Sequence, residues 1–259
     1  MTLAVANINF QDGLAVWRRN VIVHLRIWKM NLVAPIIEPV ISVLGFGWGI
    51  GALVAGTVSG VSYLSFAGAG LLAITVLMRA MFEATYASYF KMVYQSTYDA
   101  ILATPVDAES LAFAEILWAI THGLFDTIVI MIVLWIFGAA TSPWAILAPL
   151  PLLVGAMFMA GLSLGTTAHV HDIDAFNVYM AIFFSTMYVT GAFFPVEVLP
   201  AWMQIPARIL PTTESIDLTR AFLTGRFATR HIYGAIYLVI SAFVACEWAM
   251  RSLRKRMVA

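Results

Sequence analysis

Six apolar runs in this chain are each longer than a helix or strand of a soluble domain requires. They lie near residues 32–55, 61–84, 110–138, 143–168, 174–194 and 232–251. Each run approaches or exceeds the ~20 residues that an α-helix needs to cross the hydrocarbon core of a bilayer. Charged residues make up 11% of the chain, whereas a soluble domain carries about 25%. The sequence therefore predicts an all-α integral membrane protein with six transmembrane helices.

The segment that precedes the first run, residues 8–30, is amphipathic. Its apolar residues recur at steps of three and four, at Phe10, Leu14, Trp17, Val21, Leu25 and Trp28. Its basic residues lie mostly off that stripe, at Arg18, Arg19, Arg26 and Lys29. A basic amphipathic helix with tryptophan on its apolar face is typical of the membrane interface. We expect an interfacial helix here, because no soluble domain is present against which it could pack instead.

The interval 90–110 is the longest polar stretch in the first half of the chain. Apolar residues recur with helical spacing at Phe90, at Val93 or Tyr94, at Thr97 or Tyr98, and at Ile101, which predicts a short amphipathic helix over 90–104. Pro105 ends this pattern, because the residue before a proline is pushed out of the α region. Asp107 then stands at a helix N-cap position, with Glu109 in the first turn of the next span.

The segment 195–231 has a different pattern, since four prolines divide it into short pieces. We expect two short helices at the opposite membrane surface, the second capped by Thr212 or Thr213. A charged group is expected at the lip of these helices, made of Arg208, Glu214, Asp217 and Arg220.

The distribution of Lys and Arg sets the orientation of the spans. With six spans, ten of the basic residues fall on one side or near it: Arg18, Arg19, Arg26, Lys29, Arg79, Lys91, Arg251, Arg254, Lys255 and Arg256. The four remaining arginines lie on the other side, in the segment 195–231. We therefore expect both termini and the 90–104 helix to face the cytoplasm.

Three ionisable residues of the third span share one face. Glu115, His122 and Asp126 are separated by seven and four residues, so at about 100° per residue they lie within one sector of the helix. Such groups are costly inside a membrane and face a bundle interior or a wet cavity. They could line a substrate route or a proton relay, or they could form a buried contact between helices or subunits. Both readings remain open here.

Two further charged positions lie in the first two spans. Glu38 stands between two prolines early in the first span, and Arg79 lies late in the second. Glu83 follows Arg79 by four residues, so the two side chains are expected to pair on one helix face. Functional and structural roles are equally compatible with these residues.

Two motifs suggest chemistry that their surroundings do not favour. Residues 161–165 match G-x-S-x-G around Ser163, but that motif needs a strand–turn–helix context, and serine between glycines in a span usually serves helix packing. His169, His171, Asp172 and Asp174 form a cluster of possible metal ligands. The same residues would solvate a short turn and cap the next span, so we expect no metal and no catalytic residue.

Many short motifs, in order along nearly the whole chain, resemble a known family. They are Val16-Trp17-Arg18-Arg19-Asn20, Glu38-Pro39, Leu44-Gly45-Phe46-Gly47, Gly60-Val61-Ser62-Tyr63, Phe82-Glu83, Gln95-Ser96-Thr97, Glu115, Trp118-Ala119, Thr190-Gly191-Ala192, Phe194-Pro195-Val196, Leu199-Pro200, Ala207-Arg208, Leu210-Pro211 and Ser215-Ile216-Asp217-Leu218. Together they resemble the permease subunits of ABC-2 type ATP-binding-cassette transporters, and within these the branch of nodulation protein J, the lipo-oligosaccharide exporters. The chain departs from the branch at Arg79 and Asp126, where small or uncharged residues are expected.

The resemblance implies a single transmembrane domain over 1–259 that dimerises and sits on separate ATPase subunits. It implies a coupling helix at 90–104, with ATPase-contacting residues Val93, Tyr94, Thr97, Ile101 and Thr104. It also implies outer re-entrant helices over 195–223, for which the candidate gate residues are Phe194, Arg208, Glu214 and Asp217. The candidate residues of the substrate path are Glu38, Arg79, Glu115, His122 and Asp126.

The function implied is export of an amphiphile or glycan, such as a lipo-oligosaccharide, a polysaccharide, a lipid or a drug. This chain holds no phosphate-binding loop, so ATP and Mg²⁺ would be bound by the partner ATPase and no cofactor by this chain. The expected partners are that ATPase, a second copy of the chain and membrane lipids, without nucleic acid, in a bacterial inner membrane. The alternative is a self-contained machine, either a proton-coupled carrier using Glu115, His122 and Asp126 or an intramembrane hydrolase using Ser163.

Overall fold

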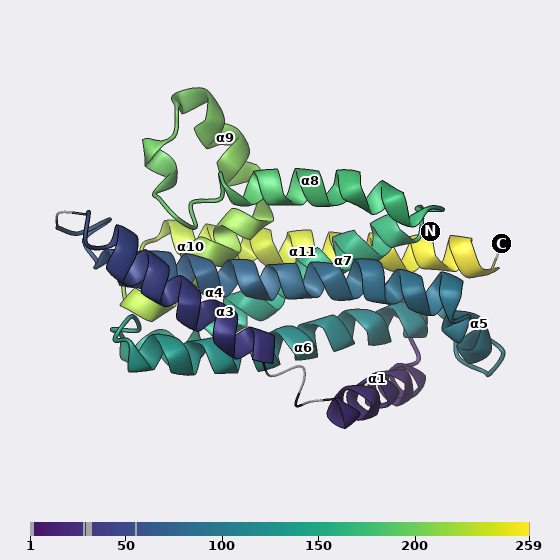
Figure 1. The fold of residues 1–259 in the computed structure, drawn as a ribbon. Coiled ribbons are helices and arrows are strands. Elements are labelled where there is room, and N and C mark those ends of the chain that lie inside the picture. Colours follow the sequence, from purple (N-terminus) through teal and green to yellow (C-terminus); the bar gives the residue numbers. More distant parts are fainter. Residues whose placement is uncertain (1–2, 28, 30–32, 55, 259) are drawn as a thin grey trace.

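The structure is a computed structural model that describes residues 3–27, 29, 33–54 and 56–258. It is a bundle of helices, and no strand occurs in the described part of the chain. The bundle is formed by α4 (Tyr63–Phe82), α6 (Ala108–Ile136), α7 (Pro149–Thr167) and α11 (Arg230–Val258), which lie lengthwise beside one another (Figure 1). Both termini and α5 (Thr97–Leu102) lie at one end, which we call the α5 end.

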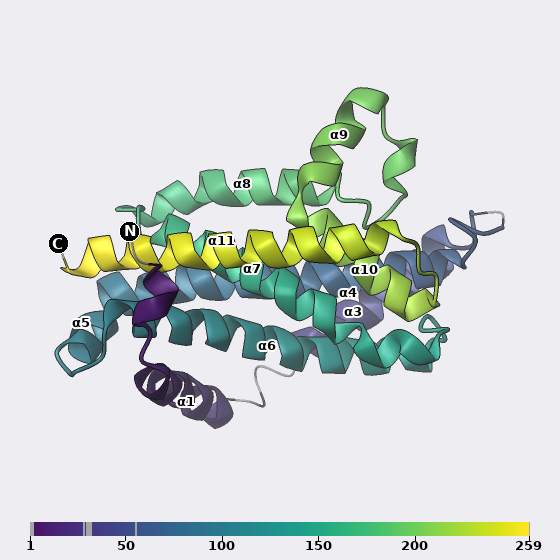
Figure 2. The same cartoon turned by 180° about the vertical axis from the view of Figure 1, so that it is seen from behind.

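The opposite end, called the α9 end, carries two short helices, as the prolines predict (Figures 1 and 2). These are α9 (Ala201–Ile209) and α10 (Pro211–Thr224). Pro211 occupies the first turn of α10, where its missing N–H costs nothing, and Gly225 ends that helix at φ +74°. The expected threonine cap is wrong: the N-cap position of α10 is Leu210, and Thr213 donates its hydroxyl to the Ala207 carbonyl instead.

Four helices in the described part are long and apolar enough to cross a membrane. They are Tyr63–Tyr94, Ala108–Ile136, Pro143–Thr167 and Arg230–Val258. They correspond to the predicted spans 61–84, 110–138, 143–168 and 232–251. The all-helical membrane class is thus confirmed. Asp107 does occupy the N-cap position of α6, although its side chain makes no capping hydrogen bond.

The other two predicted spans are shorter. The predicted span 174–194 contains α8 (Phe176–Met187), which follows a single 3-10 turn, Ile173–Ala175. Within 32–55 the structure has α3 (Val33–Leu44), continued by a π-helical turn, Gly45–Ile50. The predicted limits 32 and 55 lie outside the described residues.

The N-terminal segment folds as α1 (Phe10–Arg26), which the Asn9 side chain caps by accepting from the Gln11 N–H. A 3-10 turn, Ala4–Asn7, precedes it and is held by Glu247 of α11, which accepts the N–H groups of Ala4 and Val5. α1 packs against α6 (Figure 2). Trp28 of the predicted apolar stripe lies outside the described residues.

The predicted helix over 90–104 has other limits. Residues Phe90–Tyr94 form a wide π-helical turn that extends the long helix of α4. Ser96 then adopts a left-handed conformation at φ 45°, which ends that helix because right-handed helices exclude positive φ. Only Thr97–Leu102 forms the separate short helix α5.

Candidate functional site

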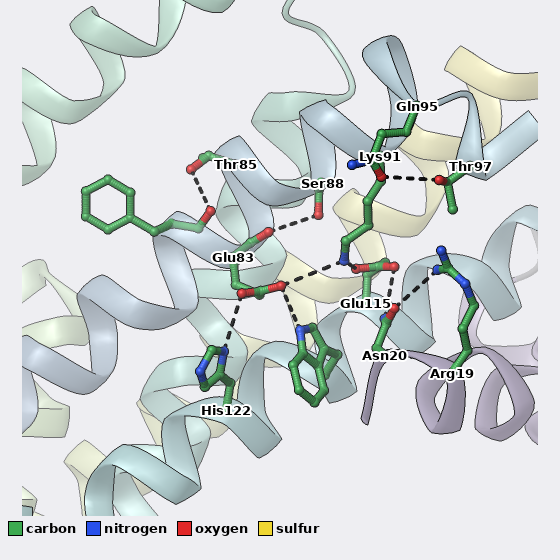
Figure 3. Close-up of polar contacts among 12 residues, drawn as sticks. Arg19, Asn20, Glu83, Thr85, Ser88, Lys91, Gln95, Thr97, Glu115 and His122 are labelled. Carbon is green, nitrogen blue, oxygen red and sulfur yellow. Dashed lines mark hydrogen bonds and ion pairs between the residues drawn. The ribbon is translucent and has the colours of Figure 1, made fainter. Parts of the chain in front are cut away.

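A network of polar side chains joins α1, the turns after α4, and α6 (Figure 3). We call it the central polar network, and its members are Asn20, Glu83, Lys91, Glu115, Trp118 and His122. Sequence reasoning placed Glu115 and His122 on one face of a helix, and the structure brings both of them to this network.

Glu83 lies at one side of the network and has three partners. Its Oε1 accepts a hydrogen bond from Trp118 Nε1 at 2.7 Å and lies 3.7 Å from Lys91 Nζ. Its Oε2 lies 3.4 Å from His122 Nδ1. The expected pairing of Glu83 with Arg79 is wrong, because Glu83 points toward α6 and Arg79 pairs elsewhere.

Glu115 lies at the other side of the network, and its side chain is 1% exposed. Its Oε2 lies 2.6 Å from Lys91 Nζ, and its Oε1 accepts from Asn20 Nδ2 at 3.2 Å. Lys91 therefore stands between two carboxylates and compensates the burial of both. A buried charge without such a partner costs several kcal/mol.

Two wide helical turns bring Glu83 and Lys91 to this place. Glu83–Ala87 and Phe90–Tyr94 are both π-helical, a form with i→i+5 hydrogen bonds that is frequent at functional sites. Inside them the Ser88 hydroxyl donates to the Glu83 carbonyl, and the Thr85 hydroxyl to that of Met81. The wider turns shift every following side chain around the helix axis, which sequence spacing based on 3.6 residues per turn does not anticipate.

α1 closes the network on a third side. Trp17 Nε1 donates to Thr121 Oγ1 at 3.0 Å, which joins α1 to α6. The His24 ring lies edge-on to the His122 ring, with 4.6 Å between the ring centroids. Burial, and then the neighbouring His122, lower the pKa of His24.

A separate ion pair lies farther along the same two helices. Arg79 Nε of α4 lies 2.6 Å from Asp126 Oδ2 of α6, and the Asp126 side chain is fully buried while that of Arg79 is 31% exposed. The two residues that the sequence analysis expected to differ from the family that the chain resembles thus partner one another. Asp126 Oδ1 and His122 Nε2 have no hydrogen-bond partner in the described part of the chain.

The polar stripe of α6 therefore faces α4 and its extension. Glu115, His122 and Asp126 each have a partner there of complementary charge or hydrogen-bonding type. This geometry matches the helix–helix contact that the sequence left open. Glu38, the remaining path candidate, lies in α3, and its side chain is outside the described part.

α5 is fastened to the bundle by one aromatic side chain. Tyr98 is fully buried and its ring lies near Ser88 and Glu115, although its hydroxyl makes no hydrogen bond of good geometry. The sequence placed Tyr98 in the apolar pattern of this segment, but Tyr98 was not among the expected ATPase-contacting residues. The burial of Tyr98 joins α5 directly to the central polar network.

The candidate coupling residues divide into two groups. Val93, Tyr94 and Thr104 are exposed, whereas Thr97 and Ile101 are half-buried and Ile101 packs on the core. Thr104 also lines an open hollow of about 600 Å³, together with Asn7, Leu102, residues 105–109, Arg254, Met257 and Val258. The α5 end thus presents an exposed rim beside a hollow.

A cavity of about 250 Å³ lies at the α9 end, between α10, the start of α11 and the turns around residues 59 and 195. Its charged lining consists of Glu197, Arg208, Glu214, Asp217, Arg220, Arg226, Arg230 and His231. Three of the four candidate gate residues line it, while Phe194 does not.

The arginines of this cavity are engaged by carboxylates or carbonyls. Arg208 Nη2 lies 2.9 Å from Glu197 Oε1, and Arg230 Nη2 lies 2.8 Å from Asp217 Oδ2. Arg220, which sequence reasoning had only grouped with the lip, stacks 3.7 Å over the Phe66 ring centroid and donates to the Gly191 carbonyl. Arg226 donates to the carbonyls of Ser59 and Gly60.

The motif around Ser163 serves packing. Ser163 lies in the middle of the helix α7, not in the strand–turn–helix context of a hydrolase nucleophile. Its side chain is buried, and its hydroxyl lies 2.9 Å from that of Tyr179. A Cβ on Gly161 would approach the Ala245 backbone of α11 to 2.8 Å, and one on Gly165 would collide with the Trp248 ring. The glycines therefore allow α7 and α11 to lie close together.

The His-Asp cluster after α7 is also structural. His169 stacks on Trp248 and its Nδ1 lies 2.8 Å from the Gly165 carbonyl oxygen. Asp172 caps the turn before α8 by accepting from the Asp174 N–H. Within the described ranges, no three His, Cys, Asp or Glu side chains gather in a way that could hold a metal ion.

Comparison with known proteins gives a consistent result. The model of the ABC-2 type transporter family matches residues 12–224. Nodulation protein J of Rhizobium leguminosarum bv. trifolii is 35% identical over 250 residues, which cover 93% of this chain and 94% of that protein. Nodulation protein J of Sinorhizobium fredii is 34% identical over 229 residues, covering 86% and 85%. The inner membrane transport permease YadH of Escherichia coli K12 is 25% identical over 240 residues, covering 91% and 93%.

Proposed function

Because this chain belongs to the family of ABC-2 type transporters, we propose that it is the permease subunit of an ATP-driven exporter. A separate ATPase subunit binds ATP and Mg²⁺ in this proposal, and this chain forms the path through the membrane. Residues 1–259 form one transmembrane domain, and two copies of the chain assemble as a dimer. The dimer lies in a bacterial inner membrane, as the name of the related inner membrane permease suggests.

The attachment of α5 is the observation that carries this proposal. α5 protrudes at the end of the bundle, yet Tyr98 fixes it to the core beside Glu115. The two π-helical turns and Lys91 continue that connection into α4 and α6. A push on α5 from outside the membrane would therefore be transmitted to the spans through packed and ion-paired groups.

We propose that α3 and α8 complete a set of six spans, with α1 lying in the membrane interface. The basic C-terminal turn of α11 and the basic face of α1 favour a cytoplasmic α5 end. The α9 end then faces outward with α9 and α10 as re-entrant helices, and its four arginines are all held by partners rather than free to anchor in the interface.

The path for cargo is proposed along the face of α4 between α3 and α8, closed by the second copy. That face carries Arg79, Phe82 and Tyr86, which are partly exposed in the single chain. Phe82 stacks with Tyr86, whose ring contacts Phe176 of α8. A mixture of aromatic rings and one guanidinium suits an amphiphile with a polar headgroup, such as a lipo-oligosaccharide, polysaccharide, lipid or drug.

The test is retention of the ATPase subunit when the permease is purified from membranes. Tyr94 ends the π-helical turn that precedes α5 and is 60% exposed at the α5 end, so Tyr94→Glu should leave insertion intact and abolish co-purification of the ATPase. Ile101→Glu is less informative, since Ile101 packs on the core and a charge there disturbs α5 itself.

Val198→Glu is the matched control, because Val198 is 72% exposed at the α9 end. This variant should retain the ATPase at the level of the unmodified chain. Retention of the ATPase by Tyr94→Glu at that same level would refute docking of the ATPase at the α5 end.

A further inference from the structure

The cavity at the α9 end contains a carboxylate that no neighbour satisfies. Glu214 lines this cavity, and in the described part of the chain it forms no hydrogen bond or ion pair within bonding distance. Burial, and then the neighbouring Asp217, raise the pKa of Glu214. Gly234 of α11 leaves space for this side chain, since a Cβ there would collide with Glu214 Oε2. The fold therefore accommodates an acceptor whose donor is missing.

The charges around Glu214 restrict what that donor can be. Four arginines and three carboxylates line the cavity. A cationic ligand would face the four guanidinium groups, and an anionic one would compete with the carboxylates and carbonyls that already hold them. A neutral ligand that both donates and accepts hydrogen bonds matches this balance.

We propose that this cavity binds one neutral sugar ring of the cargo, which rests on the proposed function as an exporter. Sugar hydroxyls donate to the oxygens of Glu214, which have no partner in the described part of the chain. Asp217 lies one helical turn farther along α10 and is already paired with Arg230 at 2.8 Å. The same hydroxyls accept from the half-exposed guanidinium groups of Arg208 and Arg230. Charge-assisted hydrogen bonds of this kind are about twice as strong as neutral ones.

The size of the cavity fits a single ring. Its volume of about 250 Å³ lies near the lower end of the ~300–1,000 Å³ of pockets that hold small molecules. A longer glycan would therefore place one residue in the cavity and the remainder outside it. During export, such a site at the α9 end would bind the first sugar of a glycan to emerge while the remaining sugars are still crossing the membrane.

The experiment uses the full chain in phospholipid nanodiscs free of sugar-based detergent. The thermal unfolding midpoint is measured against increasing maltotriose, with inorganic phosphate and spermidine as anionic and cationic probes. A ligand that binds the folded state raises this midpoint with concentration. We expect maltotriose to raise it, and the two charged probes to leave it unchanged.

Glu214→Gln keeps the shape of the side chain and removes its charge. Loss of hydrogen bonds to a charged acceptor should raise the maltotriose concentration for half-maximal shift about tenfold or more. Asp174→Asn is the control, an equivalent change at an exposed carboxylate outside the cavity, and it should behave as the unmodified chain does.

Three results would overturn the sugar site: no shift with maltotriose, a shift with phosphate or spermidine instead, or an equal response of Glu214→Gln and the unmodified chain. None of them bears on the ATPase, because the measurement uses no ATPase. Conversely, a result that refutes ATPase docking at the α5 end would leave the maltotriose binding curve unchanged. Failure of the sugar site and failure of the proposed function are therefore distinguishable.

Discussion

At the scale of single residues, Lys91 has the most demanding position in the molecule. It is the ammonium group shared by Glu83 and Glu115, at 3.7 and 2.6 Å. Removing one partner of a buried ion pair leaves an uncompensated charge, which costs more than the pair itself contributes. The stability of the network therefore depends on the cation more than on either carboxylate.

Lys91→Met should lower the free energy of unfolding by about 3–5 kcal/mol, measured by denaturant unfolding in detergent. Adding Glu115→Gln to that variant should restore most of the loss, because the stranded carboxylate is then neutral. Lys255→Met is the control at an exposed lysine, where substitutions stay within about 0.5 kcal/mol. Equal effects of Lys91→Met and Lys255→Met would contradict the central role of Lys91.

Residue partners were only partly predictable from the sequence. The shared face of Glu115, His122 and Asp126 follows from helical periodicity, and the structure has it. The pairing of Arg79 with Glu83 was predicted from the same periodicity and is wrong, since Asp126 on a distant helix takes Arg79. Residue spacing along one helix shows which side chains of that helix can pair, but it does not show which residue of another helix lies closer.

At the scale of elements, α7 and α11 pack closely against one another, and glycines on α7 allow it. Gly161→Ala would place a methyl group 2.8 Å from the Ala245 backbone, so the helices must separate. Overpacking of this kind should cost about 1–3 kcal/mol, measured as a lower thermal unfolding midpoint.

Gly45→Ala is the matched control for that change. A Cβ at Gly45 meets nothing within 4 Å, and alanine is the better helix former by about 1 kcal/mol. We expect this variant to unfold at or above the midpoint of the unmodified chain. A lower midpoint for Gly45→Ala than for Gly161→Ala would contradict the packing described.

The anchor of α5 makes a separate prediction. Tyr98→Ala removes a fully buried ring, which typically costs about 3–5 kcal/mol, and it should lower ATP-driven export more than it lowers membrane insertion. Tyr98→Phe removes only a hydroxyl without a well-formed hydrogen bond, so export and stability should remain. The measurement is transport per inserted molecule; an equal loss in both variants would contradict anchoring by the ring.

Element type was predicted better than element limits. The long apolar runs predicted the helices of the bundle, and the prolines of 195–231 predicted the two short helices at the α9 end. The limits of the 90–104 helix were wrong because the π-helical turn Phe90–Tyr94 and the left-handed Ser96 lie there. The spacing of apolar residues on which the prediction rested does not mark either feature.

At the scale of the whole molecule, two polar regions lie at opposite ends of one bundle. The α5 end carries the exposed rim and the hollow of about 600 Å³, and the α9 end carries the charged cavity of about 250 Å³. The central polar network and the Arg79–Asp126 pair lie along the helices between them. This division favours energy input at one end and cargo recognition at the other.

The most direct measurement is export by the purified chain in liposomes, with and without its ATPase subunit. Release or uptake of a fluorescent lipo-oligosaccharide is followed after addition of ATP and Mg²⁺. The account predicts transport only when the ATPase subunit is present, and none with Tyr94→Glu. Transport by the chain alone, without an ATPase, would contradict it.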